Sequence, residues 1–297
     1  MFSIAKKMAN RMASKIFLTA ALIFFIHPAW AVVETDPGDY IPLPAGTNLA
    51  VLYYQHAERD SYYINGEKAN FPFKLDTDLA IARYVHFFDV AGLRANVQAI
   101  VPFASVRESL PGSLTSNGAG DPFVGANLWL LNDQAAQRYL ALGAFLAIPI
   151  GSYDASKGGV NPGENRWKGV FHLSYGQQII GRLGLDVTGE YAVYGENDDY
   201  IGSAYQQRPT FEVQSHLRYA LTPLTTLAVS YIWTMGGRTS LGGVDQNDRI
   251  NTGRYLLTVA HMFGPTLQLE GQVGQDVHVS NGAKERFRIN VRLLKLF

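Results

Sequence analysis

The sequence predicts an all-β protein, a twelve-stranded antiparallel transmembrane β-barrel with short periplasmic turns and long extracellular loops. Three observations predict this fold. Segments of about ten residues, in which apolar and polar side chains alternate, recur along most of the 297-residue chain. They are joined in turn by short turns and by long loops rich in Gly, Pro, Asn and Ser. Finally, no apolar run is long enough to cross a membrane as a helix.

The first 31 residues have the three parts of a signal peptide. A basic stretch ends at Lys15, the apolar run Ile16–Ile26 follows, and the segment closes at Ala31 in an Ala-x-Ala pattern that a signal peptidase accepts. The apolar run reaches only about half-way across a ~30 Å hydrocarbon core, which argues against an uncleaved membrane anchor. We therefore expect a signal peptide over residues 1–31, cleavage after Ala31, and a mature chain that begins at Val32.

Composition excludes several classes of protein. Lys+Arg and Asp+Glu both total 25, but Lys6, Lys7, Arg11 and Lys15 fall in the signal segment, so the mature chain is acidic. An acidic chain argues against a nucleic-acid partner, because binding to phosphates requires a clustered positive field. The chain has no cysteine, which excludes disulfide scaffolds, thiolate metal sites and cysteine nucleophiles.

The mature chain divides into two parts. Residues 32–46 contain Pro37, Pro42 and Pro44, which favour an extended chain over any regular element. We expect these residues to form an extended periplasmic N-terminal segment. We expect residues 47–297 to form the outer-membrane β-barrel.

Alternation is clearest near the C-terminus, where Leu269 and Val273 share one face of a segment and Glu270 and Gln272 the other. The stretch 139–148 is apolar on both faces, and we assign it as a strand because its internal glycine and the following proline disfavour a stable helix. The twelve predicted strands cover residues 47–59, 73–87, 92–103, 120–131, 138–149, 166–178, 183–195, 208–220, 225–236, 250–263, 266–277 and 285–297.

A soluble β-sandwich or a lipocalin-like barrel would show the same alternation with its apolar face inside. Two observations favour the inverted, membrane-embedded barrel. Twelve strands enclose more volume than side chains readily fill, which suits a polar interior. The chain also ends on a strand with Phe297 at its terminus, as outer-membrane barrels commonly do.

Two stretches resemble the outer-membrane transporter family of the phenol meta-cleavage degradation pathway. Gly120-Asp121-Pro122 opens an aromatic-rich strand, and Asn161-Pro162-Gly163 with Trp167-Lys168-Gly169 precedes a strand that ends in Tyr175-Gly176-Gln177-Gln178. The strand rhythm extends this resemblance over nearly the whole mature chain. The resemblance implies a barrel that takes up aromatic hydrocarbons or other hydrophobic compounds, and it implies no particular binding residue. Lys295 departs from the apolar residue usual near the end of such barrels, although its stem can snorkel toward water.

The candidate site is the lumen. Its charged residues either form a field that selects permeating solutes or pair across neighbouring strands, as Glu270 and Asp276 would with Arg286, Arg288 or Arg292. Asp121 is either a gate residue or an ordinary strand start. Aromatic side chains such as those of Phe145 and Trp129 would bind aromatic solutes or simply pack the interior. The candidate lumen-lining and solute-contacting residues are Arg94, Asp121, Phe123, Trp129, Phe145, Glu190, Glu212, Arg218, Glu270, Arg288 and Arg292.

One stretch favours an enzyme instead. His278-Val279-Ser280-Asn281-Gly282 is similar to the His-x-Ser-Asn-Gly stretch of outer-membrane phospholipases, which are serine hydrolases. Such a site needs a third group to orient the histidine. The nearest downstream asparagine, Asn290, falls on the inward face, so we expect no outward orienting asparagine and no enzyme.

The sequence thus predicts an outer-membrane transporter or channel for small hydrophobic or aromatic compounds, which cross the barrel passively. The alternatives are a phospholipase-like serine hydrolase and a closed structural barrel. We expect no cofactor and no metal site. The expected partners are outer-membrane lipids, the barrel-assembly machinery and the small-molecule solute, with no nucleic acid.

Overall fold

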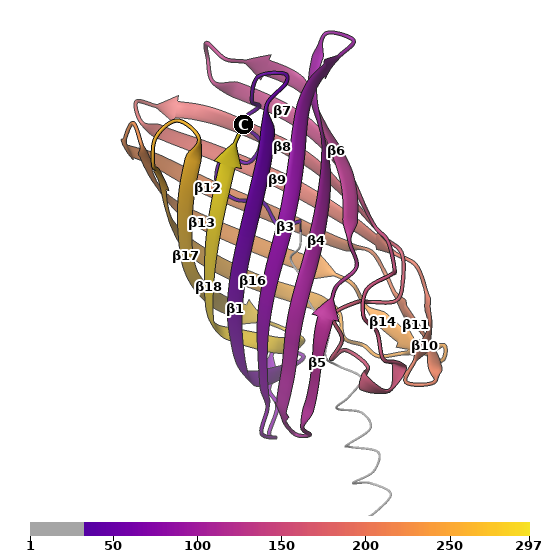
Figure 1. Ribbon diagram of the computed structural model, residues 1–297. Coiled ribbons are helices and arrows are strands. Elements are labelled where there is room, and N and C mark those ends of the chain that lie inside the picture. The colour runs from indigo at the N-terminus through magenta and orange to yellow at the C-terminus, as the bar shows by residue number, and fades with distance from the viewer. Residues whose placement is uncertain (1–32) are drawn as a thin grey trace, which may run out of the picture.

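The structure, a computed structural model, describes residues 33–297, and the predicted signal peptide lies outside these residues. Twelve long strands form a closed antiparallel barrel (Figure 1), which confirms the predicted fold. The strands are β1 (Asn48–Ile64), β3 (Lys74–Val90), β4 (Leu93–Leu110), β6 (Phe123–Asp133), β7 (Arg138–Ala147), β8 (Lys168–Ile180), β9 (Leu183–Tyr194), β12 (Thr210–Thr222), β13 (Thr225–Gly236), β16 (Ile250–Met262), β17 (Leu267–Val279) and β18 (Gly282–Leu296).

The barrel closes between its first and last strands. β1 pairs with β18 along nearly its whole length, from Leu49 opposite Leu296 to Tyr63 opposite Gly282. This closure leaves no long open sheet edge, because the backbone donors and acceptors of both strands are paired.

The two ends of the barrel differ as predicted. Tight turns such as Ala91-Gly92 join strands at the end where β1 begins and β18 finishes, which we call the short-turn end. The opposite, long-loop end carries small additional elements. These are β2 (Glu67–Lys68), β5 (Leu114–Ala119), η1 (Ala155–Lys157), β10 (Asn197–Tyr200), β11 (Ser203–Gln207), β14 (Thr239–Leu241) and β15 (Val244–Asp245). Within residues 33–297, no helix is long and apolar enough to cross a membrane.

Three predicted loops contain strands that the sequence analysis missed. Residues 104–119 form the extension of β4 and its hairpin partner β5. Residues 196–207 and 237–249 contribute β10, β11, β14 and β15 to a separate four-stranded sheet over the long-loop end. The pairs β4–β5, β10–β11 and β14–β15 are local hairpins of short segments rich in turn residues, and the pairing of β11 with β14 joins two loops that lie far apart in the sequence.

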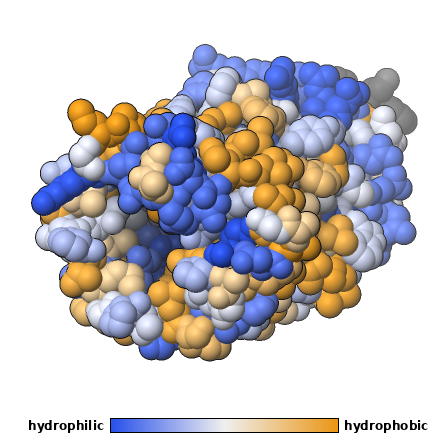
Figure 2. Space-filling view, turned by 90° about the horizontal axis from the view of Figure 1, so that it is seen from above, coloured by the Kyte–Doolittle hydropathy of each residue, from blue (hydrophilic) through white to orange (hydrophobic). Residues whose placement is uncertain are grey.

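Side chains alternate between the interior and the outer wall. Leu269 and Val273 are 42% and 43% exposed, whereas Glu270 and Gln272 between them are 2% and 4% exposed. Strand β7, which is apolar on both faces, places the lumen candidate Phe145 inside the barrel and exposes Leu142 on the outer wall. Figure 2, viewed onto the short-turn end, shows hydrophilic residues along much of the rim and hydrophobic side chains on the flanks.

The predicted facing is wrong at Arg286. A register shift between β1 and β18 at Glu58 and Arg59 turns Arg286 outward, where it is 61% exposed and pairs with Glu58 and Asp60. The inward position passes to Glu285, which is 1% exposed. A β-bulge adds one residue to a strand and therefore inverts the alternation beyond it.

The largest correction concerns the N-terminal segment, which was expected in the periplasm. Residues 33–46, which we call the luminal segment, lie inside the barrel. Thr35 and Tyr40 form hydrogen bonds with side chains of β12 and β8, and Gly46 bonds to the end of β3. The segment thus runs from the interior near the long-loop end to the start of β1 at the short-turn end.

Candidate solute pathway

Hydrogen bonds hold the luminal segment against β12, β8 and β6 of the barrel wall. The Thr35 backbone N–H donates to Gln214 Oε1 at 2.7 Å, and the Thr35 hydroxyl lies 2.9 Å from His216 Nε2. Farther along, Tyr40 Oη lies 2.7 Å from His172 Nδ1, and Trp129 Nε1 donates to the Tyr40 carbonyl oxygen at 2.9 Å. Each contact joins the segment to a buried side chain, so the chain's own N-terminal residues lie inside the lumen and are anchored to its wall.

Buried ion pairs fix the charged side of the luminal segment. Arg292 Nη1 lies 2.8 Å from Asp36 and 3.0 Å from Asp39, and its Nη2 donates to Glu270 at 2.8 Å. The expected pairing of Glu270 with Arg292 is therefore confirmed. Asp276 instead pairs with Arg254, at 3.0 Å, because Arg254 lies directly opposite it on the neighbouring strand β16.

Further ion pairs lie on both sides of Arg292 along the barrel, with Arg288 nearer the long-loop end and Arg218 nearer the short-turn end. Arg288 is 1% exposed and contacts Glu34 at 3.3 Å and Glu285 at 2.8 Å. Arg218 pairs with Asp186 at 2.5 Å, and Asp186 also accepts the Gly38 N–H at 2.9 Å. These contacts favour the interpretation in which the luminal charges pair with one another and with the luminal segment.

The opposite half of the interior carries three buried apolar clusters, between which Thr77 and Arg83 of β3 also face inward. Three buried clusters follow one another along β3, beginning with Leu75 at the long-loop end, continuing through Leu79 and Ile81, and ending with Val85 and Phe87. We call this surface the apolar track. Its other buried members include Tyr62, Phe73, Val106 and Val160 in the first cluster, Ile100, Phe123, Phe145 and Val170 in the second, and Tyr40, Trp129 and Tyr139 in the third.

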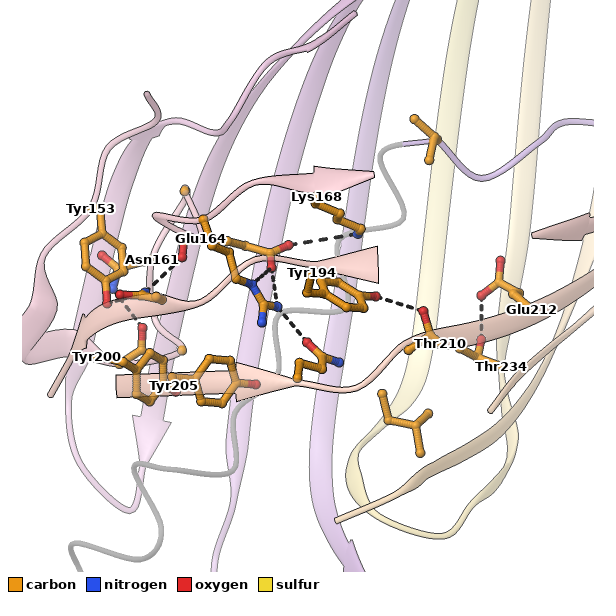
Figure 3. Close-up of a pocket in the computed structure, with 18 of the residues that line it drawn as sticks. Tyr153, Asn161, Glu164, Lys168, Tyr194, Tyr200, Tyr205, Thr210, Glu212 and Thr234 are labelled. Carbon is orange, nitrogen blue, oxygen red and sulfur yellow. Dashed lines mark hydrogen bonds and ion pairs between the residues drawn. The ribbon is translucent and has the colours of Figure 1, made fainter. Parts of the chain in front are cut away.

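A cavity of about 120 Å³ lies in the interior next to the loops of the long-loop end. Figure 3 shows the rings of Tyr153, Tyr194, Tyr200 and Tyr205 around it. The Arg166 guanidinium stacks between two of these rings, 4.6 Å from the centroid of Tyr194 and 5.1 Å from that of Tyr205. Stacking of this kind stabilises a buried cation.

The sequence analysis missed most of this cavity. Glu164 contacts two cations of the cavity wall, Arg166 at 2.5 Å and Lys168 at 4.0 Å. Lys168 lies in one of the two stretches that carry the family resemblance, which was the available signal. The tyrosines come from separate loops, and nothing in the spacing of Tyr200 and Tyr205 indicates that they meet Tyr153.

Asp121 joins two segments of the chain at the long-loop end of the barrel wall. Its carboxylate accepts the backbone N–H groups of Gly151 at 2.8 Å and Glu164 at 2.7 Å. Burial raises the pKa of Asp121, and these two backbone donors oppose that rise. Both oxygens are thus engaged in holding the loop 148–167 against the start of β6. This arrangement favours a positioning role, and a role as a gate stays a prediction.

The remaining candidates lie on the interior side. Arg94 pairs with Asp89 and donates to the Leu43 carbonyl oxygen near the short-turn end. Glu190 and Glu212 line the cavity at the long-loop end. Contact of any candidate with a solute stays a prediction.

The structure corrects one argument against an enzyme. Asn251 of β16 lies beside His278 and Ser280 on the outer wall, so an outward asparagine is present after all. His278 Nε2 is 3.2 Å from Ser280 Oγ and 3.3 Å from Asn251 Nδ2. Both partners therefore contact the same ring nitrogen, whereas a serine hydrolase requires the orienting group on the other one. Asn290 bonds to Gln272 inside the barrel, as expected.

Comparisons with known proteins agree with this architecture. The chain is 34% identical to the COG4313 outer membrane channel from Pseudomonas putida F1, with a TM-score of 0.85 over 89% of this chain and 100% of that one. The β domain of the Bordetella autotransporter BrkA has a TM-score of 0.55 at 11% identity, covering 86% of this chain and 100% of that one. The translocator domain of NalP from Neisseria meningitidis has a TM-score of 0.52 at 11% identity, covering 97% of each. The last two show the fold alone.

No curated protein matches this chain. A family model described as "Putative MetA-pathway of phenol degradation" matches residues 59–293, which span almost the entire barrel. Since the match covers well over half of the chain, and the Pseudomonas channel is similar over its whole length, the chain belongs to this family of phenol-degradation outer-membrane barrels.

Proposed function

We propose that this protein is an outer-membrane channel for the passive passage of small hydrophobic compounds, aromatic ones among them. Its family and its likeness to the Pseudomonas channel establish the passive outer-membrane channel. The hydrophobic substrate class is our proposal, and one observation carries it. The apolar track extends from Leu75 near the extracellular loops to Phe87 near the periplasmic turns. A polar solute would gain nothing from such a surface, whereas an apolar one is transferred from water onto it favourably.

The luminal segment covers the track in the closed channel. Val33 packs against the middle cluster, and Tyr40, Ile41 and Leu43 belong to or pack against the periplasmic one. A solute that enters along the track must therefore displace these side chains. We propose that apolar solutes compete with them for the same surface, since both interact through burial of apolar area.

We also propose that transport involves no catalytic step. The neighbours in fold are channels and translocator barrels, and the contacts of His278 differ from those of a hydrolase. Ser280→Ala should leave both uptake and lipid composition unchanged. Release of fatty acid from phospholipid vesicles by the wild-type protein but not by Ser280→Ala would contradict this proposal.

The predicted signal peptide also indicates how the chain reaches the outer membrane. We propose that cleavage occurs after Ala31 and that the barrel-assembly machinery inserts the chain among outer-membrane lipids. Mass spectrometry of protein purified from outer membranes should give an N-terminus at Val32. A chain that retains residues 1–31 would contradict the cleavage site.

Uptake of a radiolabelled aromatic hydrocarbon such as toluene by expressing cells tests the substrate class. Phe145→Glu places a charge in the middle of the apolar track, where Phe145 is 6% exposed, and should lower the uptake rate. Leu146→Glu makes the same change at the next residue, which is 42% exposed on the outer wall, and controls for assembly. Expression in outer membranes is measured for both. Unchanged uptake in a correctly assembled Phe145→Glu variant would refute the hydrophobic route.

A further inference from the structure

Lys168 lies at the boundary between the cavity of the long-loop end and the apolar track. Strand pairing places it in one row of the inner wall with Phe123 of β6, Ala147 of β7 and Tyr194 of β9. Phe123 and Ala147 belong to the middle cluster of the track. Tyr194 packs against the same cluster and lines the cavity (Figure 3). A solute that leaves the cavity for the track therefore passes Lys168.

A second, smaller cavity supports this placement. It measures about 20 Å³, and Phe123 and Ala147 of the middle cluster contribute to its wall. Within residues 33–297, the residues that line both cavities are Glu164, Arg166 and Lys168. These three charged side chains consequently form the partition between the larger cavity and the track.

Two side chains of the partition are firmly held. Arg166 Nε and Nη2 lie 2.9 Å and 2.5 Å from Glu164 Oε2, and Nη2 also donates to Gln207 at 2.6 Å. The guanidinium is in addition stacked between the rings of Tyr194 and Tyr205. Movement of Arg166 or Glu164 would break several of these contacts at once, so both form a rigid part of the partition.

Lys168 is held much less firmly. Its Nζ lies 4.0 Å from Glu164 and 5.4 Å from the centroid of the Tyr194 ring, and it donates no hydrogen bond to the part of the chain that the structure describes. A separation of 4.0 Å is too long for a hydrogen bond. Lysine also carries its charge on a flexible four-carbon stem. Lys168 is therefore the side chain of the partition that can move aside for a solute.

The contact with Tyr194 determines which solute Lys168 favours. A cation at this distance from a ring is attracted by the negative face of the π-system. When Lys168 moves aside, an aromatic solute offers its ammonium group a second ring in place of that of Tyr194. A saturated solute of the same size offers none, and the cation then faces hydrocarbon, which is unfavourable for a charge.

We propose that Lys168 is a specificity-determining residue, which admits aromatic solutes to the apolar track in preference to saturated hydrocarbons. This inference rests on the proposed hydrophobic route and deepens it, because burial of apolar area alone does not distinguish the two classes. Saturated hydrocarbons still enter, but more slowly.

The ratio of the uptake rates of toluene and methylcyclohexane tests the proposal, after subtraction of the rates in cells without the protein. The two solutes share a carbon skeleton, and only toluene has a π-system. Lys168→Met keeps a long side chain without the charge and should lower this ratio about 2- to 5-fold, as expected for the loss of one partly exposed cation–π contact. Lys168→Arg retains a cation that stacks on aromatic rings and should keep the wild-type ratio.

Lys157→Met is the matched control. Lys157 also lies at the long-loop end and pairs with an acid, Asp154, at 3.8 Å, but it does not line the cavity. This variant should keep the wild-type ratio, and the amount of each variant in outer membranes is measured. An unchanged ratio in Lys168→Met, or an equal decrease in Lys168→Arg or Lys157→Met, would overturn the proposal.

A direct measurement of contact separates this proposal from the proposed function. Lysines dimethylated with carbon-13 formaldehyde in the unfolded chain give NMR signals after refolding in micelles, and the signal missing in Lys168→Arg belongs to Lys168. A nuclear Overhauser effect from the ring protons of toluene to this signal is expected. Its absence would overturn the proposal even where toluene uptake is normal. Its presence without any uptake would support Lys168 as the contact and refute the proposed passage.

Discussion

Arg292 is the residue whose removal should release the luminal segment most directly. It is 5% exposed, and its guanidinium lies 2.8 Å from Asp36, 3.0 Å from Asp39 and 2.8 Å from Glu270. Arg292→Gln leaves these carboxylates buried without their cation, which destabilises a protein by about 3–5 kcal/mol. If the loss falls on the docked state of the luminal segment, the ratio of docked to released segment decreases between about 10²- and 10⁴-fold, since 1.4 kcal/mol is tenfold.

Single-channel recording in planar bilayers measures this shift as an increase in open probability. Arg286→Gln is the matched control, because Arg286 is on the same strand and also contacts two carboxylates, but it is 61% exposed at the rim. Exposed pairs contribute about 0–1 kcal/mol, so the control should behave as wild type. Adding Asp36→Asn to Arg292→Gln removes one unpaired charge and should recover part of the loss. Equal open probabilities for the Arg292→Gln and Arg286→Gln channels would refute the view that buried ion pairs hold the segment.

Three further predictions concern the wall and the loops. Val273→Arg puts a charge on the lipid-facing wall and should lower the free energy of unfolding by about 2–4 kcal/mol near the bilayer midplane. Val244→Arg, at an exposed position of β15, should change it by less than about 0.5 kcal/mol. Urea titration in lipid vesicles measures both. Asp121→Asn loses one of two backbone hydrogen bonds and should weaken the hold on the loop 148–167 by about 1–3 kcal/mol, seen as faster cleavage of that loop by protease. An epitope inserted at Lys157 should be accessible outside intact cells and one at Gln134 should not; the reverse result would invert the barrel.

The strands could be predicted because their periodicity is local. An alternation such as Leu269, Glu270, Gly271, Gln272, Val273 depends only on which side of the wall each residue faces. The facing of β7 could be extended from its neighbours for the same reason. The alternation fails at Arg286, where a bulge inserts one extra residue into β18. No residue pattern in the sequence indicates this bulge.

The interior could not be predicted to the same extent. Thr35 contacts Gln214 across an interval of 179 residues, and nothing in an extended Pro-rich segment indicates that it docks inside a barrel. Asn251 escaped notice for a related reason, because it reaches His278 from the neighbouring strand and not from the downstream sequence. The sequence also gives no sign that Arg288 pairs with Glu34, or Arg292 with Asp36 and Asp39, because it does not specify the position of the luminal segment.

The two halves of the interior bind the luminal segment by different physical means, and this difference determines how the channel opens. Arg288 and Arg292 hold acidic residues of the segment through directional, buried contacts that solvent salt screens little. The apolar track holds Val33, Ile41 and Leu43 only through buried area, which an apolar solute replaces without loss. On the proposed route, a hydrophobic solute would enter between the segment and the track while the ion pairs stay intact. An ion or sugar has no comparable exchange to offer, so we expect the luminal segment to hinder polar solutes more than apolar ones.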